Sequence, residues 1–156
     1  MRDVYITFTA TKYFDESSYY LKRVVREAVK ATLDFEDFPY DAEVSVTFCD
    51  NEYIRGLNNQ FRGIDRHTDV LSFPMYEDGD FDEIECAGGA VLGDIVISIE
   101  RAKEQAKEIG NTFHHEIAFL TVHSVLHLLG YDHERSKIDE EEQCQRQRAI
   151  MENVDI

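Results

Sequence analysis

His123, His127 and His133 are the residues of this chain whose types and spacing most clearly predict a chemistry. Residues four apart on an α-helix leave the same face of that helix, so the imidazoles of His123 and His127 can converge. Gly130 predicts the end of the helix, since glycine enters the left-handed conformation without a Cβ penalty, and the chain can then bring His133 toward the other two rings. Three neutral imidazoles leave one position of a tetrahedral Zn²⁺ open, as in catalytic zinc sites. We therefore predict one divalent ion per chain, with Zn²⁺ inferred from the three histidine ligands.

The residue that follows the first histidine distinguishes this motif from that of a peptidase. Metzincin peptidases carry H-E-x-x-H-x-x-G-x-x-H, in which the glutamate is the general base. Ser124 occupies that position here, and an alcohol of ordinary pKa cannot replace a carboxylate. Either another residue takes the proton, or the metal acts mainly by lowering the pKa of its bound water to about 7. A metallopeptidase remains an alternative, which Ser124 disfavours.

The histidine motif is one of four distinctive blocks between residues 57 and 133. The four read L-N-N-Q-F-R at 57–62, T-D-V-L-S-F-P at 68–74, L-G-D-I at 92–95 and H-S-V-L-H-L-L-G-Y-D-H at 123–133. In this order they resemble the signature of the YbeY family of endoribonucleases and rRNA maturation factors. Two positions depart from the family pattern: Phe61 replaces the usual tyrosine, and His67 stands where proline is common.

The resemblance implies a metal-dependent, single-strand-specific endoribonuclease that acts in small-subunit rRNA 3′-end processing and in ribosome quality control. The implied partners are single-stranded RNA, rRNA and the small ribosomal subunit with its associated proteins, and neither DNA nor a membrane is expected. By the same resemblance, Arg62 stabilises the charge that builds on the phosphorane, and His123 takes part in the chemistry besides binding metal. The remaining alternative is a non-catalytic ribosome-assembly factor with a structural metal, and the open coordination position and Arg62 favour the enzyme.

The residues that would orient the metal ligands are less well defined by the sequence. A metal-bound imidazole usually donates its other N–H to a carboxylate, a carbonyl or a water. Asp132, adjacent to the last histidine, and Asp94, on a predicted strand, are both candidates, and turn chemistry explains Asp132 equally well. His114 and His115 fall in the first turn of the histidine helix, where a cation opposes the helix dipole, so we assign them no role. We expect His67 on a loop surface.

The charge of the chain opposes long-range attraction to a polyanion. Its 156 residues carry a formal net charge of −16, with acidic runs at 77–85 and 139–142. Two basic groups stand apart from these runs: Lys22, Arg26 and Lys30, four residues apart on a predicted helix, and Arg55, Arg62 and Arg66. A solvated helix face explains the first group, and an RNA-binding surface is the alternative. We expect weak, salt-sensitive binding of free RNA.

Length, cysteine usage and hydropathy indicate the class of protein. The length suits one domain over residues 1–156. The three cysteines, Cys49, Cys86 and Cys144, include no Cys-x-x-Cys pair, which favours separate thiols in a reducing compartment. The N-terminus has no apolar export region, and no apolar run is long enough to span a bilayer. We therefore expect a cytoplasmic protein.

The apolar pattern predicts an α+β architecture: a small mixed sheet packed with helices. Alternation predicts strands at 4–8, 44–48, 70–73 and 91–98, and helical spacing predicts helices at 21–33, 51–61, 99–109 and 112–129. We expect the first two strands to be parallel, because a helix connects them. The 112–129 helix is apolar on nearly all sides and should be a central, buried metal-binding helix. Ser136 and Asp139 resemble a capping box that opens a last helix, and the acidic segment 76–90 is a candidate flap over the site.

Overall fold

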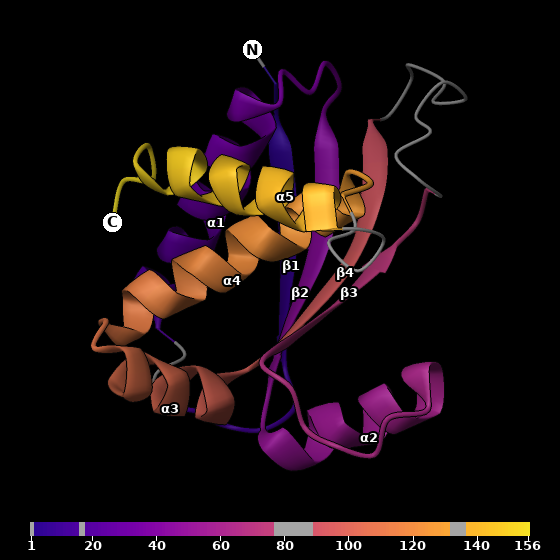
Figure 1. Ribbon diagram of the computed structural model, residues 1–156, viewed down its shortest axis with the longest axis vertical. Helices are drawn as coiled ribbons and strands as arrows, with labels where there is room; N and C mark the ends of the chain where they lie inside the picture. Colours follow the sequence, from indigo (N-terminus) through magenta and orange to yellow (C-terminus); the bar gives the residue numbers. More distant parts are fainter. Residues whose placement is uncertain (1, 16–17, 77–88, 132–136) are drawn as a thin grey trace.

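The computed structural model describes residues 2–15, 18–76, 89–131 and 137–156, and within these ranges the chain forms four strands and five helices (Figure 1). In chain order they are β1 (Val4–Ala10), α1 (Tyr19–Phe35), β2 (Ala42–Cys49), α2 (Asn51–Arg62), β3 (Val70–Pro74), β4 (Ala90–Ser98), α3 (Ile99–Ile109), α4 (Phe113–Leu128) and α5 (Lys137–Met151). The predicted helices and strands are therefore present, and most of their ends lie within a few residues of the predicted positions.

The strands form one mixed sheet in the order β1-β2-β4-β3. β1 pairs with β2 in parallel, β2 pairs with β4 in parallel, and β3 runs antiparallel to β4. The predicted parallel pairing of the first two strands is confirmed, as is the mixed α+β class. Among the described residues, β1 and β3 are the two edge strands of this sheet.

The helices cover the two faces of the sheet unequally. α1 and α4 pack on one face, where Val70 of β3 and Ile95 and Ile97 of β4 join the main hydrophobic core. α2 covers the other face through Ile54, which packs in a second cluster with β3 and β4. α5 packs on α4 and α1, and Figure 1 shows it lying across α4, away from α2. Consequently, α2 and α4 lie on opposite faces of the edge strand β3.

α4 is the central helix that its composition predicts. Ten of its 16 residues are buried, and they extend around most of its circumference, as expected for a helix enclosed by other elements. Its start is capped by Thr112, whose hydroxyl accepts a hydrogen bond from the His115 N–H at 3.1 Å. A rigid, enclosed helix is a suitable support for side chains that must hold a fixed geometry.

Gly130 ends α4 as the sequence predicts, although the helix stops at Leu128 rather than at residue 129. Gly130 has a φ of 108°, in the region that favours glycine. Its N–H donates to the His127 carbonyl, and the Tyr131 N–H donates to the Leu126 carbonyl, both at 3.0 Å. This pair of bonds is the Schellman motif. It turns the chain sharply just beyond His127, on the way to the segment that contains His133.

Several predictions fall partly or wholly on residues that the structure does not describe. The main part of the candidate flap, residues 77–88, and Ser136 of the capping box lie outside the described residues. Of the cysteines, Cys49 is buried, Cys144 is exposed and both are free thiols, whereas Cys86 lies outside the described ranges. Within those ranges, the helices lack the length and hydropathy that crossing a bilayer requires.

Candidate active site

His123 and His127 lie next to each other on α4, as their spacing predicts. Their ring centroids are 5.1 Å apart, with 52° between the ring planes, and both side chains are half-buried. With Zn–N bonds of about 2.0–2.1 Å and tetrahedral angles, two imidazoles on one zinc ion have centroids about 5 Å apart. The separation of the two described rings is therefore the one that a shared divalent ion would require.

The Nδ1 atom of His123 is held by two glutamines of α5. Gln147 Nε2 lies 2.6 Å from it, and Gln143 Nε2 lies 3.3 Å from it. Both glutamines are buried, with 4% and 1% of their surface exposed. Nδ1 is therefore the His123 nitrogen that faces α5. α5 is thus part of the site, a role that the sequence did not suggest.

Asp94 does not orient the histidines. It pairs in register with Phe73 of β3, and side chains alternate between the two faces of a strand. Because Ile95 belongs to the core beneath α4 and Val96 to the cluster beneath α2, Asp94 lies on the α2 face, where it is exposed. The prediction that Asp94 could contact a metal-bound histidine is therefore wrong. Asp132, the other candidate, lies outside the described residues.

Gly93 allows α4 and β3 to approach β4 closely. Its φ is 142°, and a Cβ built on it would lie 2.2 Å from the Phe73 carbonyl oxygen and 3.1 Å from Leu128 Cδ2. Only a residue without a side chain fits this position without displacing backbone. Leu128 follows His127 directly, so Gly93 sets how closely this end of α4 packs on the sheet.

Arg62 lies at the end of α2, where it is exposed. Gly63 ends the helix in the left-handed conformation, with a φ of 69°, and the neighbouring Phe61 packs edge-on against Phe73 with ring centroids 5.2 Å apart. This contact fixes the end of α2 to β3. Arg62 therefore comes from a helix on the opposite face of β3 to the helix that carries the two histidines.

Comparison with known proteins identifies the family. The family model described as Endoribonuclease YbeY matches residues 6–155. The chain belongs to the YbeY family. It is 50% identical over 146 residues to the Endoribonuclease YbeY of Caldanaerobacter subterraneus, with 87% of this chain and 89% of the relative covered. It is 48% identical over 132 residues to that of Bacillus cereus, with 83% of each covered.

A solved structure shares the fold of this chain. The solution structure of TM1509 from Thermotoga maritima aligns with a TM-score of 0.61 at 32% sequence identity, and the alignment covers 96% of this chain and 88% of that one. The family model and the named relatives confirm the resemblance predicted from the four sequence blocks, and with it membership of an endoribonuclease family.

Asp69, in the block at 68–74, belongs to a hydrogen-bond network that joins three elements. Asp69 Oδ1 accepts the Val70 N–H at 2.7 Å, and its Oδ2 accepts a bond from Gln105 Nε2 of α3 at 3.0 Å. The same Gln105 nitrogen donates to Glu116 of α4 at 3.1 Å. Burial raises the pKa of the Glu116 carboxyl above its ordinary value. Asp69 therefore ties the start of β3 to α3 and α4.

Ser124 is buried in the core of this YbeY chain. None of its surface is exposed, and its Oγ has no hydrogen-bond partner among the described residues. The position of the peptidase general base thus faces the interior rather than a substrate. This placement further disfavours the metallopeptidase alternative.

Lys22, Arg26 and Lys30 form an exposed stripe along α1, as predicted. Arg26 and Lys30 line a surface pocket of about 580 Å³ together with Arg2, while Lys22 Nζ lies 5.7 Å from the Phe8 ring centroid. The stripe is therefore available to a ligand in solvent. A role for it in RNA binding stays a prediction.

The predicted metal ligands are only partly contained in the described structure. Outside residues 1, 16–17, 77–88 and 132–136, no group of three histidine, cysteine or acidic side chains is close enough together to hold a metal ion. The third predicted ligand, His133, belongs to one of those undescribed segments. His114 and His115 occupy the first turn of α4, as predicted, and the exposed His67 lies in the loop before β3.

Proposed function

We propose that this YbeY-family chain is a cytoplasmic, metal-dependent, single-strand-specific endoribonuclease that acts in small-subunit rRNA 3′-end maturation and in ribosome quality control. The observation that carries the metal dependence is the His123–His127 pair on α4, whose 5.1 Å centroid separation suits one shared ion. The relatives from Caldanaerobacter subterraneus and Bacillus cereus are named Endoribonuclease YbeY, which supports an RNA substrate.

The residues that would hold the ion are His123 and His127, with His133 as the third ligand. Imidazole nitrogens suit Zn²⁺ among the common divalent ions. When bound, the ion supplies Lewis acidity toward an attacking water and a phosphate oxygen. Two rings on a buried, capped helix keep their spacing without reorganisation, which such a site requires.

Gln147 and Gln143 would fix the tautomer of His123. If a glutamine amide oxygen accepts the Nδ1–H, the Nε2 lone pair is left for the metal. Gln143 supports this orientation: its Oε1 is buried with no partner among the described residues, while its Nε2 faces Nδ1 at 3.3 Å. Rotation of that amide by 180° exchanges its nitrogen and oxygen with little change in the other atoms, and places the oxygen on the imidazole N–H.

Arg62 would stabilise the negative charge that develops on the phosphate during strand cleavage. Its guanidinium offers two parallel N–H donors to two phosphate oxygens, and donors aimed at developing charge contribute strongly to catalysis. Because α2 and α4 lie on opposite faces of β3, the substrate strand would cross the edge of β3 between them. A flexible single strand can follow that path, whereas a stiff A-form duplex presents mainly its shape and its minor groove.

One paired assay separates this function from its two alternatives. A labelled single-stranded RNA and a casein substrate are each incubated with the protein, with and without a chelator. We expect RNA cleavage that the chelator abolishes and no cleavage of casein. Casein cleavage would support a peptidase, and RNA cleavage that persists in chelator would contradict the proposed metal dependence. If neither substrate is cleaved, a non-catalytic assembly factor is the better account.

A further inference from the structure

A pocket lined mainly by basic side chains lies between α2, the loop after α2 and α3. It has a volume of about 520 Å³ and is lined by Arg55, Asp65, Arg66, His67 and Arg101. We name it the arginine pocket. Three arginines around one cavity are unexpected in a chain whose formal net charge is −16, and a local concentration of positive charge is the usual mark of an anion-binding surface.

Two of the three arginines already have carboxylate partners. Arg55 forms a two-point ion pair with Asp65, at 2.8 and 3.2 Å. Arg101 Nη1 binds Glu104 at 3.1 Å and Glu108 at 3.2 Å.

Arg66 differs from the other two. Its side chain is exposed and makes no ion pair or hydrogen bond with any described residue, and the same holds for the adjacent His67. Arg66 is therefore the arginine of this pocket whose guanidinium no described carboxylate contacts.

The backbone around Arg66 is held in place even though its side chain is exposed. The buried Asn58 donates from its side-chain amide to the Arg66 carbonyl at 2.9 Å, and the Arg66 N–H donates to the Ile64 carbonyl at 3.0 Å. Gly63, in the left-handed conformation, turns the chain between α2 and this segment. An anchored backbone that presents an unpaired guanidinium reduces the conformational entropy that a ligand must remove on binding.

The arginine pocket lies near Arg62 along the chain. Arg55 and Arg62 are seven residues apart on α2, so they share a face of this helix at a spacing of about 10 Å. Arg66 follows Arg62 by four residues, after the turn at Gly63. A strand that contacts Arg62 can therefore continue along α2 toward the pocket. The planar guanidinium fork matches the oxygens of a phosphate.

We propose that the arginine pocket binds a backbone phosphate of the single-stranded RNA substrate, outside the reacting centre, with Arg66 as its principal contact. This inference rests on the proposed endoribonuclease function and extends it by assigning a second place where the substrate is held. The ligand is a phosphodiester of the same strand that passes Arg62. The pocket increases the affinity for this strand and fixes its position along the protein, and it takes no part in the cleavage step.

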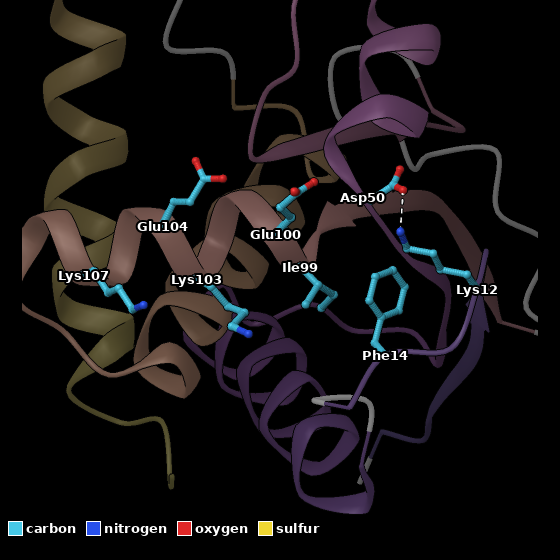
Figure 2. A pocket seen from close by; sticks show the side chains of 8 residues that line it. All are labelled: Lys12, Phe14, Asp50, Ile99, Glu100, Lys103, Glu104 and Lys107. Atoms are coloured by element: carbon cyan, nitrogen blue, oxygen red, sulfur yellow. Dashed lines mark ion pairs between the residues drawn. The ribbon is translucent and has the colours of Figure 1, made fainter.

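A second pocket on α3 provides a matched control. Its volume is about 380 Å³, and it is lined by Lys12, Phe14, Asp50, Ile99, Glu100, Lys103, Glu104 and Lys107. Figure 2 shows its three lysines interspersed with three carboxylates, with an ion pair of 2.8 Å between Lys12 and Asp50. This cavity has no excess of positive charge. Lys107 is exposed, so Lys107→Ala removes the same unit charge as Arg66→Ala without touching the arginine pocket.

The test measures the salt dependence of RNA binding. Fluorescence anisotropy of a short labelled single-stranded RNA is recorded over a range of salt concentrations for the parent, Arg66→Ala and Lys107→Ala. Loss of one phosphate contact should reduce the slope of log K against log salt by about 0.7 for Arg66→Ala. Lys107→Ala should keep the parent slope. A parent slope in Arg66→Ala, or equal reductions in both variants, would overturn the inference.

Kinetics and competition complete the test. Because the pocket lies outside the reacting centre, Arg66→Ala should raise KM for RNA cleavage while kcat stays at the parent value.

Arg66→Lys keeps the positive charge, so its log K against log salt should have most of the parent slope. Displacement of the labelled RNA by an acidic peptide as effectively as by unlabelled RNA would overturn the assignment of a phosphate ligand. If the parent cleaves RNA in a chelator-sensitive way and the salt slopes are unchanged, this inference fails while the proposed function stands.

Discussion

Gln147 Nε2 lies 2.6 Å from His123 Nδ1, and this contact joins α5 to α4 at the face that carries the histidine pair. Gln143, one turn earlier on α5, approaches the same nitrogen at 3.3 Å. Through these contacts, a helix that looks acidic and solvated in the sequence becomes part of the candidate metal site. The contact also gives Nδ1 of His123 a structural partner.

Replacing Gln147 by alanine should lower metal affinity by about 10- to 100-fold, the usual effect of removing a side chain that orients a metal ligand. The measurement is competition for the ion with a chromophoric chelator. Gln147→Glu should bind metal at least as tightly as the parent, because a carboxylate can only accept the Nδ1–H. The exposed Gln145 on the same helix is the control, and Gln145→Ala should match the parent. Parent affinity in Gln147→Ala would show that α5 does not support the site.

Arg62→Ala should fold and bind metal as the parent does, because Arg62 is exposed at the end of α2. Its rate of RNA cleavage under single-turnover conditions should fall by about 10²–10³-fold, as expected when a donor to developing charge is removed. Gln60→Ala, an exposed change on the same helix, should keep the parent rate. Cleavage by Arg62→Ala at the parent rate would remove Arg62 from the reacting centre.

Gly93→Ala should destabilise the protein by about 2–4 kcal/mol, since a Cβ at this position would lie 2.2 Å from the Phe73 carbonyl oxygen and the φ is 142°. Gly56→Ala is the control, and it should stabilise the protein rather than destabilise it. Gly56 lies within α2 and no atom lies within 4 Å of its built Cβ, so alanine should add about 0.5–1 kcal/mol. Urea denaturation of both variants measures these changes. Equal stability of Gly93→Ala and the parent would contradict the close packing of β3, β4 and α4.

Glu116→Gln should change how stability depends on pH. Burial raises the pKa of Glu116 above its ordinary value of 4.5, and Asp69 adds to the shift, while Gln105, His115 and Arg101 oppose it. A carboxyl with a raised folded-state pKa contributes stability that is present below its unfolded pKa and is lost as the pH rises through its folded pKa. Parent melting temperatures should therefore fall relative to those of Glu116→Gln as the pH rises above 4.5. A melting-temperature difference that does not vary with pH would contradict this.

Several local features of the fold and the site could be predicted from the sequence because neighbouring residues determine them. Gly130 ends α4 through hydrogen bonds to its last turn. The adjacency of His123 and His127 follows from the period of the helix alone. Each of these features depends on side-chain type and on spacing within a few residues.

Features that depend on contacts between distant segments could not be predicted. Gln143 and Gln147 are spaced so that they share a face of α5 with Ile150. A glutamine in a sequence does not predict a buried position, because glutamine is usually exposed. Their partner His123 belongs to another helix. The face on which Asp94 lies depends on the neighbours of Ile95 and Val96 in the assembled sheet. In both cases the missing information was the packing partner rather than the local pattern.

Metal titration of RNA cleavage tests the central claim most directly. The protein is stripped with a chelator, dialysed and supplied with increasing Zn²⁺ while cleavage of a single-stranded RNA and bound metal are measured together. We expect no cleavage by the stripped protein and a rate that saturates at one ion per chain, with His127→Ala losing both the ion and the activity. Full cleavage by protein that holds no metal ion, or by His127→Ala, would contradict the account.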